Sequence, residues 1–190
     1  MEFVDVIYRH PLSKKRKMRK WYQIAKAGDV SYGYAHQILS ELQDKKIIKG
    51  SNVKKPRKLF ELWSYHPINI LYREYQVQRP KNIFKNIKLN YAFTTYFAEN
   101  IVGNYLFPRL FDIYIHEEDS LDWHSILSQK GFAGKGNVRI LLSDKHVFWD
   151  GKIIDGWPIV SIQQLIVDLM REGVECSEAA DLLIKRFYND

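Results

Sequence analysis

The highest density of reactive side chains lies within nine positions of the second half of the chain. Two histidines and four acidic residues occur there: His116, Glu117, Glu118, Asp119, Asp122 and His124. Imidazole and carboxylate groups bind metal ions and transfer protons, so this set could form a metal or acid–base site. Its spacing does not match the His-Glu-x-x-His helix motif, and no remote ligand stands out. We interpret the segment as a charged connection in which Asp119 or Ser120 begins a helix.

Three other segments contain residues that enzymes use. Asp144 and Lys145 follow a predicted strand, as nuclease catalytic pairs do. The glycine-rich stretch 131–137 lacks the spacing of a phosphate-binding loop, and Cys176 has no histidine or asparagine nearby in sequence. We predict no catalytic residue, no metal site and no cofactor. The enzymatic alternative is a metal-dependent nuclease that uses Asp112, His116, Glu117 or Asp144.

The excess of positive over negative charge lies in the first third of the chain. Residues 1–63 contain 15 Lys and Arg against 6 Asp and Glu, whereas residues 64–190 contain 14 against 16. The net charge of +7 therefore arises from one segment. Segregated charge of this kind predicts a module that binds a polyanion, joined to a nearly neutral module with a different role.

The basic segment contains the signals of a helix, a tight turn, a second helix and a hairpin. A helix that carries Trp21 ends at Gly28, and Ser31 can cap a second helix over 32–45. Four apolar positions form one buried stripe on the second helix: Ala35, Ile38, Leu39 and Leu42. Two extended apolar runs flank a basic, turn-rich stretch, which predicts a β-hairpin. The two runs are 47–48 and 59–63, and the basic stretch between them is 50–58.

This order of elements resembles the winged helix-turn-helix superfamily, in which the second helix of the pair enters the major groove of double-stranded DNA. The spacing that carries the resemblance is Leu39, Leu42, Lys45 and Ile48. Five outward positions are predicted to contact bases: Gly33, Tyr34, His36, Gln37 and Ser40. Gln37 can pair bidentately with adenine. Eight cations on either side of the helix pair are predicted to contact phosphates: Lys14, Lys15, Arg16, Arg19, Lys54, Lys55, Arg57 and Lys58.

Helix and strand signals alternate after residue 65. A connecting helix and linker are expected over 66–82, followed by an α+β domain over 83–190. The helices of that domain are predicted at 91–102, 120–127, 162–172 and 177–187. Its extended elements are predicted at 110–116 and 138–142 and in a hairpin over 147–154 that turns at Asp150-Gly151. The predicted fold class is therefore α+β, with a winged helix-turn-helix over 1–65 and a mixed α/β C-terminal domain.

The last hundred residues resemble the AbiEi-like type IV antitoxin family. A Val-Ser-x-x-Gln-x-x-x-Asp-Leu helix followed by an Ala-rich helix carries the resemblance. The matching positions are Val160, Ser161, Gln164, Asp168, Leu169, Ala179, Ala180 and Leu183. The resemblance implies an autorepressing antitoxin whose second domain opposes a nucleotidyltransferase-like toxin. Gln164 and Asp168 lie one turn apart on one helix face, so they could hydrogen-bond each other or bind that partner.

These observations predict a cytoplasmic, DNA-binding transcriptional regulator that is the repressor and antitoxin of a type IV toxin–antitoxin pair, and not an enzyme. The first alternative is a stand-alone winged-helix regulator whose second domain senses a ligand or dimerises, and the second is the nuclease. Neither a signal peptide nor a membrane-spanning run of about 18 apolar residues is evident. Two-fold operators commonly imply dimers or paired monomers, so a homodimer is one of two expected arrangements.

Overall fold

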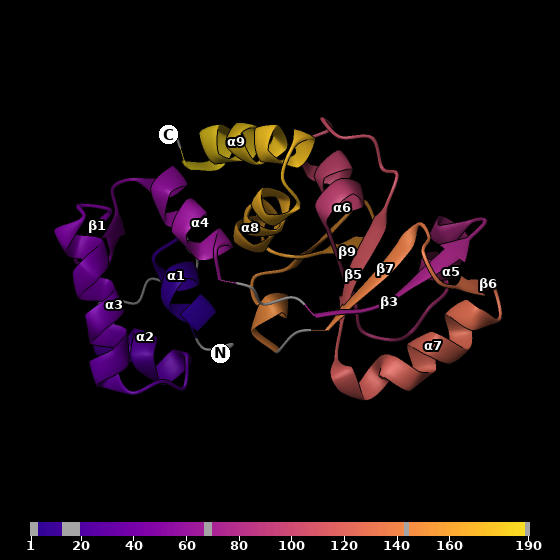
Figure 1. The fold of residues 1–190 in the computed structure, drawn as a ribbon, viewed down its shortest axis with the longest axis horizontal. Helices are drawn as coiled ribbons and strands as arrows, with labels where there is room; N and C mark the ends of the chain where they lie inside the picture. Colours follow the sequence, from indigo (N-terminus) through magenta and orange to yellow (C-terminus); the bar gives the residue numbers. More distant parts are fainter. Residues whose placement is uncertain (1–3, 13–19, 67–69, 143–144, 189–190) are drawn as a thin grey trace.

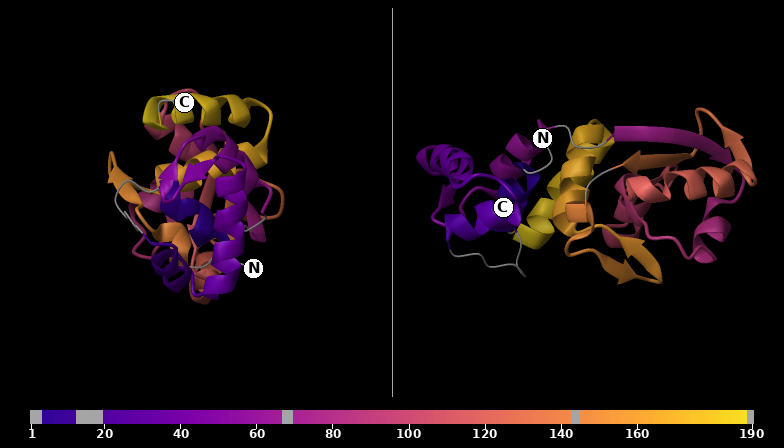
Figure 2. Two further views of the ribbon diagram at one scale, coloured as in Figure 1. Left: turned by 90° about the vertical axis from the view of Figure 1, so that its left-hand side faces the viewer. Right: turned by 90° about the horizontal axis from the view of Figure 1, so that it is seen from below.

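The computed structural model describes residues 4–12, 20–66, 70–142 and 145–188. The first part of the chain forms helices and a short hairpin (Figure 1). Their order is α1 (Val4–Leu12), α2 (Trp21–Ala27), α3 (Tyr32–Asp44), β1 (Ile48–Lys49), β2 (Asn52–Val53) and α4 (Pro56–Ser64). The α3 helix lies at the end of the molecule opposite the sheet, and a view onto that end shows the helices of the first part in front (Figure 2).

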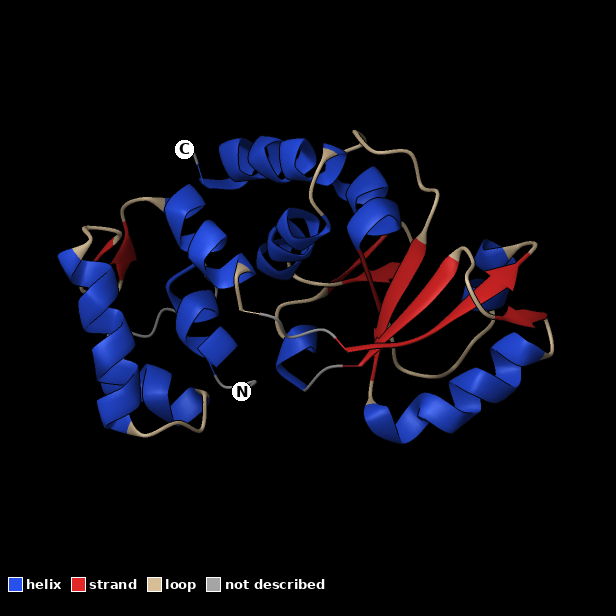
Figure 3. Cartoon of the chain, in the orientation of Figure 1, coloured by secondary structure: helices blue, strands red, loops and turns tan. Residues whose placement is uncertain are grey.

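The remaining described residues build a mixed sheet of seven strands with helices packed on it (Figure 3). Across the sheet the strands are β6 (Gly131–Ala133), β3 (Ile70–Val77), β7 (Val138–Leu142), β5 (Phe111–Ile115), β4 (Ala92–Thr94), β9 (Trp157–Ile159) and β8 (Lys152–Ile154). The β5–β7 and β4–β9 pairs are parallel, and the other pairs are antiparallel. The protein is therefore α+β, as predicted.

Helices cover both faces of this sheet. They are α5 (Pro80–Lys85), α6 (Thr95–Val102), α7 (Ser120–Ser128), α8 (Ile162–Glu172) and α9 (Glu175–Tyr188), with 3-10 turns η1 (Glu117–Asp119) and η2 (Lys145–Phe148). Successive strand residues point to opposite faces. On one face, Thr94 and Tyr114 both bond Asp168 of α8. On the other, Phe93 and Phe111 pack on Phe84 of α5, with ring centroids 4.9 and 6.4 Å apart.

The two parts share one continuous interface. The α1 and α4 helices pack against α8, and α4 also packs against α9. Gln163 of α8 and Tyr188 of α9 both donate to the Leu12 carbonyl oxygen, over 3.1 and 3.3 Å. The ring of Phe60 in α4 meets the Tyr188 ring edge-on at 5.2 Å. Burial of these apolar rings joins the first part to the last two helices.

Most of the predicted elements are confirmed. The helix with Trp21, the Ser31-capped helix, the strands near 110–116 and 138–142, and the helices near 120–127, 162–172 and 177–187 are all present. The helix predicted over 91–102 is shorter than expected, because residues 92–94 form β4 before α6 begins. Part of the glycine-rich stretch 131–137 pairs with β3 as the edge strand β6.

The second strand of the predicted hairpin is wrong, because residues 59–63 belong to α4. Pro56 occupies the first turn of this helix, where its missing N–H costs nothing. Leu59, Phe60 and Trp63 are buried, and their spacing places them on one helical face. The hairpin itself is reduced to β1, a two-residue turn and β2.

The connecting helix predicted over 66–82 is also wrong. Residues 70–77 form β3, and α5 begins at Pro80. Tyr75 and Val77 are buried while Gln76 between them is exposed, which is the period-two pattern of a strand. This part of the chain is therefore an integral strand of the sheet.

The hairpin predicted over 147–154 turns at a different place. Residues 145–148 form η2, and β8 pairs instead with β9. The turn between β8 and β9 contains Asp155 and Gly156, whose φ values of 50° and 81° suit a tight type I′ turn. Within the described residues, no helix combines the length and the apolar character needed to span a membrane.

Candidate nucleic-acid interface

The α2 and α3 helices form a tightly connected pair at the exposed end of the molecule. Gly28 ends α2, and Asp29 adopts a left-handed φ of 51° that reverses the chain. The Val30 amide then donates to the Ala25 carbonyl oxygen over 3.1 Å, which closes the turn. The Ser31 hydroxyl accepts a hydrogen bond from the Tyr34 amide over 3.2 Å, and this cap fixes the first turn of α3.

The outward side of α3 presents most of the residues that were predicted to contact bases. Gly33, Tyr34, His36 and Gln37 are exposed, and Ser40 is half-buried. The opposite side of the helix carries the predicted apolar stripe, of which Ala35, Leu39 and Leu42 are fully buried and Ile38 is partly buried. The amide of Gln37 donates to Glu41 over 3.5 Å, and no carboxylate lies in the helix before Glu41. The first half of α3 is thus free of acidic side chains.

Aromatic rings surround His36 and extend this surface. Trp21 meets the His36 ring edge-on at 5.1 Å, and Tyr32 contacts it at 5.7 Å. Tyr22 and Tyr32 are exposed by 61% and 50%. The Ser40 hydroxyl lies 3.3 Å from Nδ1 of His36. Sequence reasoning missed Trp21, Tyr22 and Tyr32; their signal was aromatic character outside the buried stripe.

The short hairpin places additional lysines beside the end of α3. Gly50 turns the hairpin with a φ of 61°, and its amide donates to the Gln43 side chain over 3.1 Å. The Trp21 indole donates to the Gly50 carbonyl oxygen over 3.4 Å, so the hairpin is tied to both helices. A hollow of about 460 Å³ lies here, and its lining is Gln43, Lys46, Ile48, Lys49 and Lys54. Lys46 and Lys49 were not among the predicted phosphate contacts.

The residues predicted to contact phosphates fall into three groups: exposed lysines, cations in ion pairs, and residues outside the described ranges. Lys54 and Lys55 are exposed and follow β2 directly. Lys58 forms an ion pair of 3.0 Å with Glu61, and Arg57 pairs with Asp181 of α9 over 2.9 Å. Arg57 and Lys58 belong to α4 instead of a hairpin tip. The remaining four, Lys14, Lys15, Arg16 and Arg19, lie outside the described residues.

Gln164 and Asp168 are buried, so their polar groups serve the interior instead of a partner. The Gln164 amide donates to Asp168 over 2.8 Å, and Arg9 of α1 donates to the Gln164 oxygen. Asp168 also accepts hydrogen bonds from Thr94, at 2.6 Å, and from Tyr114, at 3.0 Å. Burial, and then the Asp168 carboxylate, raises the pKa of Tyr114, which keeps this phenol a neutral donor. Of the two alternatives left by the sequence, the geometry favours internal bonding.

Arg171 extends the same network to the first part of the chain. Its guanidinium pairs with Asp168 at 3.2 Å and donates to the His66 carbonyl oxygen at 2.5 Å. Weaker bonds of 3.4 Å reach the carbonyl oxygens of Trp63 and Ser64 at the end of α4. A cation at a helix C-terminus satisfies carbonyl groups that the helix leaves open. Arg171 thereby links α8 to α4.

Asp112 is committed to a buried ion pair. Both of its carboxylate oxygens accept hydrogen bonds of 2.6 Å from Arg139, and the Thr95 hydroxyl also donates to it. Arg139 in turn pairs with Glu172 over 3.0 Å. Burial raises the pKa of Asp112, and the Arg139 guanidinium offsets part of this effect. Because its oxygens are occupied, this carboxylate is poorly placed to bind a catalytic metal.

The acidic and histidine-rich stretch does not converge on one point. Glu117 and Glu118 are exposed, and the His116 ring packs on Phe148 at 4.4 Å. His124 faces β3, where the Tyr75 hydroxyl and an Arg73 nitrogen each lie 2.8 Å from its Nδ1. Across the described ranges, no group of three or more histidine, cysteine, aspartate or glutamate side chains is arranged to hold a metal ion. Asp144, the remaining nuclease candidate, lies outside those ranges.

Comparison with known proteins adds no assignment to this geometry. No family model, no curated protein and no solved structure matches the chain. The functional argument therefore depends on the residues and contacts described above.

Proposed function

We propose that this protein is a DNA-binding transcriptional regulator, and not an enzyme, in which the first part is a winged helix-turn-helix with an unusually short wing. In this proposal α3 is the recognition helix and enters the major groove of double-stranded DNA. The observation that carries the proposal is the exposed face of α3, which displays Tyr34, His36 and Gln37. The helix itself lies at the end of the molecule opposite the sheet (Figure 1).

The side chains on this face match the chemistry of base edges. The Gln37 amide can donate one hydrogen bond to adenine and accept another from it. To do so it must give up its long hydrogen bond of 3.5 Å to Glu41. Tyr34 and His36 can hydrogen-bond a base or pack on a thymine methyl group. Gly33 has open space where a Cβ would stand, which supports close approach of the helix backbone to the duplex.

The cations near α3 suit contacts with phosphates. Lys46, Lys49 and Lys54 line the hollow beside the hairpin, and Lys55 follows it. Phosphate contacts supply affinity and register, whereas base contacts supply sequence preference. The exposed rings of Tyr22 and Tyr32 add surface that can pack against sugar and base edges.

The proposal is tested by selecting bound duplexes from a random pool, followed by electrophoretic titration at two salt concentrations. Gln37→Ala is expected to cost about 1–3 kcal/mol for the selected site only. The double variant Lys49→Ala/Lys54→Ala is expected to weaken all sequences alike and to lower the salt slope by about 1 for each lost phosphate contact.

Two matched variants control for general effects of these substitutions. Gln129→Ala removes another exposed glutamine at the end of α7, and Lys152→Ala removes an exposed lysine on β8. Neither is expected to change DNA binding. Failure to select any duplex, or equal losses from the base-contact and phosphate-contact variants at every sequence, would contradict the assignment.

The antitoxin role, the toxin partner and a homodimeric state stay predictions from the resemblance and from operator symmetry. The helix and Ala-rich helix that carry the resemblance form α8 and α9, and Ala179 and Ala180 are buried between packed elements. A toxin would have to bind elsewhere than Gln164 and Asp168, because both are buried. Copurification with the product of a neighbouring toxin-like gene tests this role.

A further inference from the structure

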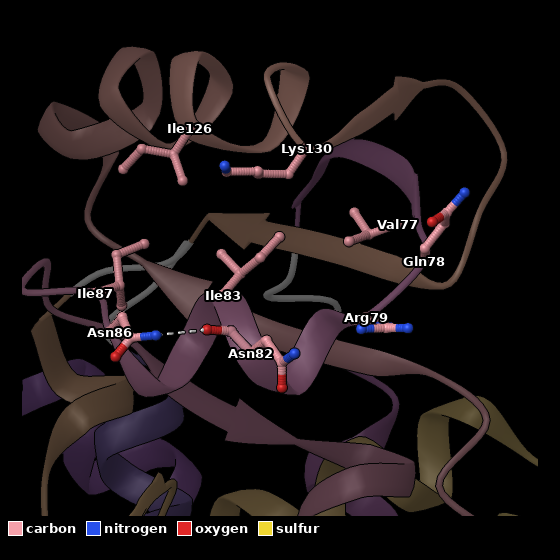
Figure 4. A pocket seen from close by; sticks show the side chains of 9 residues that line it. All are labelled: Val77, Gln78, Arg79, Asn82, Ile83, Asn86, Ile87, Ile126 and Lys130. Atoms are coloured by element: carbon pink, nitrogen blue, oxygen red, sulfur yellow. Dashed lines mark hydrogen bonds between the residues drawn. The ribbon is translucent and has the colours of Figure 1, made fainter.

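One cavity lies at the end of the sheet domain that is remote from α3. A cavity of about 860 Å³ separates α5 from α7, near the end of β3 (Figure 4). A cavity of this size is typical of sites for small organic molecules. Its position places it outside the proposed DNA interface.

Aliphatic side chains form two walls of this cavity. Ile83 and Ile87 extend from the α5 side, and Ile126 faces them from α7 (Figure 4). All three are only partly buried, so they leave apolar surface open to the cavity. A bound apolar group would cover this surface and gain hydrophobic free energy.

Two cations stand at the same cavity. Lys130 extends along α7 toward Ile126, and Arg79 lines the cavity just before α5 (Figure 4). Both are exposed, and neither takes part in the ion pairs found among the described residues. On α7, the acidic residue one turn before Ile126 is Asp122, which is exposed.

The neighbouring lysines of α5 are directed at other groups. The Lys81 ammonium lies 5.3 Å from the Phe97 ring centroid, and that of Lys85 lies 5.9 Å from the Trp157 ring. The cavity therefore has a local charge supplied by Arg79 and Lys130. This local positive charge contrasts with residues 64–190 as a whole, which have two more acidic than basic residues.

We propose that this cavity binds a small amphipathic carboxylic acid. Its carboxylate would be attracted by the two cations that line the cavity, Arg79 and Lys130, and its apolar body would lie against Ile83, Ile87 and Ile126. A nucleic acid is a poorer fit, because stacking of bases requires aromatic rings and these walls are aliphatic. A neutral apolar molecule would leave both cations unused, so charge complementarity selects the acid.

The test is a titration of the full chain with sodium octanoate, followed by amide NMR shifts, with 1-octanol as the neutral counterpart. Octanoate is expected to shift amides of α5 and α7 in a saturable manner, and 1-octanol to bind at least several-fold more weakly. Lys130→Glu replaces attraction by repulsion and is expected to weaken octanoate binding by about tenfold. Lys152→Glu, the same change on the exposed strand β8, is expected to have no effect.

Three results would overturn the proposal: no saturable shift at α5 and α7, equal binding of octanol and octanoate, or equal losses from Lys130→Glu and Lys152→Glu. Arg79→Gln provides a second variant that removes the charge but keeps a polar side chain, and it is expected to weaken octanoate binding by a smaller factor. Because the cavity and α3 lie at opposite ends, failure of this test leaves DNA binding by α3 untouched.

Discussion

Gly33 lies in the first turn of α3, on its exposed side, where a glycine has no evident structural need. Its φ is not in the left-handed region, and a Cβ built there meets no atom within 4 Å. Glycine lowers the stability of a helix through its backbone entropy. A glycine kept at this position is therefore better explained by what approaches it from outside.

Gly33→Ala is expected to raise the free energy of unfolding by about 0.5 kcal/mol, because alanine loses less backbone entropy in a helix. The same methyl group is expected to lower DNA affinity by about tenfold, or ~1.4 kcal/mol, by keeping α3 away from the duplex. Urea denaturation and electrophoretic titration measure the two effects. Unchanged DNA affinity in this more stable variant would argue against close approach at Gly33.

Glu99 is a buried carboxylate that gives a prediction about pH. It is only 1% exposed, and it accepts hydrogen bonds from the amides of Leu106, at 2.6 Å, and Tyr105, at 3.2 Å. Burial raises the pKa of Glu99, and these two amides offset part of the shift. A carboxyl with a raised folded-state pKa favours folding when protonated. Its contribution is complete below the unfolded-state pKa and is lost as the pH rises through the folded-state pKa.

Glu99→Gln removes this titration while keeping an acceptor oxygen for the amides. The unfolding free energy of the variant, relative to the natural protein, is therefore expected to increase as the pH rises from 4 to 7. Urea denaturation at several pH values checks this. Glu118→Gln, an exposed change in η1, serves as the control. A difference that is constant or decreases with pH would show that burial does not dominate at Glu99.

At the level of elements, Arg171 of α8 makes polar contacts with the C-terminal end of α4. Arg171→Met removes a charged donor from Asp168 and from the carbonyl groups at the end of α4, and it is expected to cost about 2–3 kcal/mol. Arg57→Met, which breaks an exposed ion pair with Asp181, is expected to cost no more than about 1 kcal/mol. Thermal or urea denaturation ranks the two. Equal costs would indicate that Arg171 acts only as a surface cation.

Elements with local signals were predictable from the sequence. Ser31 and Ser161 each cap the helix that follows, and Gly173 ends α8 with a φ of 77°. In contrast, the apolar run 59–63 is short enough to suit a strand or a buried helix, and only its packing on α8 decides between them. The run 70–77 has charged residues at its centre, and its place between β6 and β7 depends on residues far along the chain.

The candidate interface was predictable only where its residues have a local signal in the sequence. The exposure of Tyr34, His36 and Gln37 follows from the apolar stripe of α3, which the sequence displays directly. The hollow that contains Lys46 and Lys49 depends on how the hairpin folds against α3, so it has no local signal. The burial of Gln164 and Asp168 depends on Arg9 and Tyr114, which lie far from them in sequence.

At the scale of the whole molecule, the interface between the first part and the last two helices predicts cooperative unfolding. Buried contacts join α1 and α4 to α8, so neither part is expected to open alone. Hydrogen exchange measured along a urea series is expected to show α4 and β5 losing protection at the same urea concentration. Earlier loss of protection in α4 would indicate two independent units.

The packing of α9 against α4 also has a consequence for biosynthesis. Tyr188 contacts both Phe60 and the Leu12 carbonyl oxygen, and Asp181 pairs with Arg57, so the ribosome makes these partners of α9 long before it makes α9 itself. Until α9 emerges, the part of α4 that packs on it stays uncovered, and a nascent chain exposes that part to chaperones and proteases. Messages truncated before α9 are therefore expected to yield rapidly degraded fragments, which would limit the amount of incomplete protein in the cell.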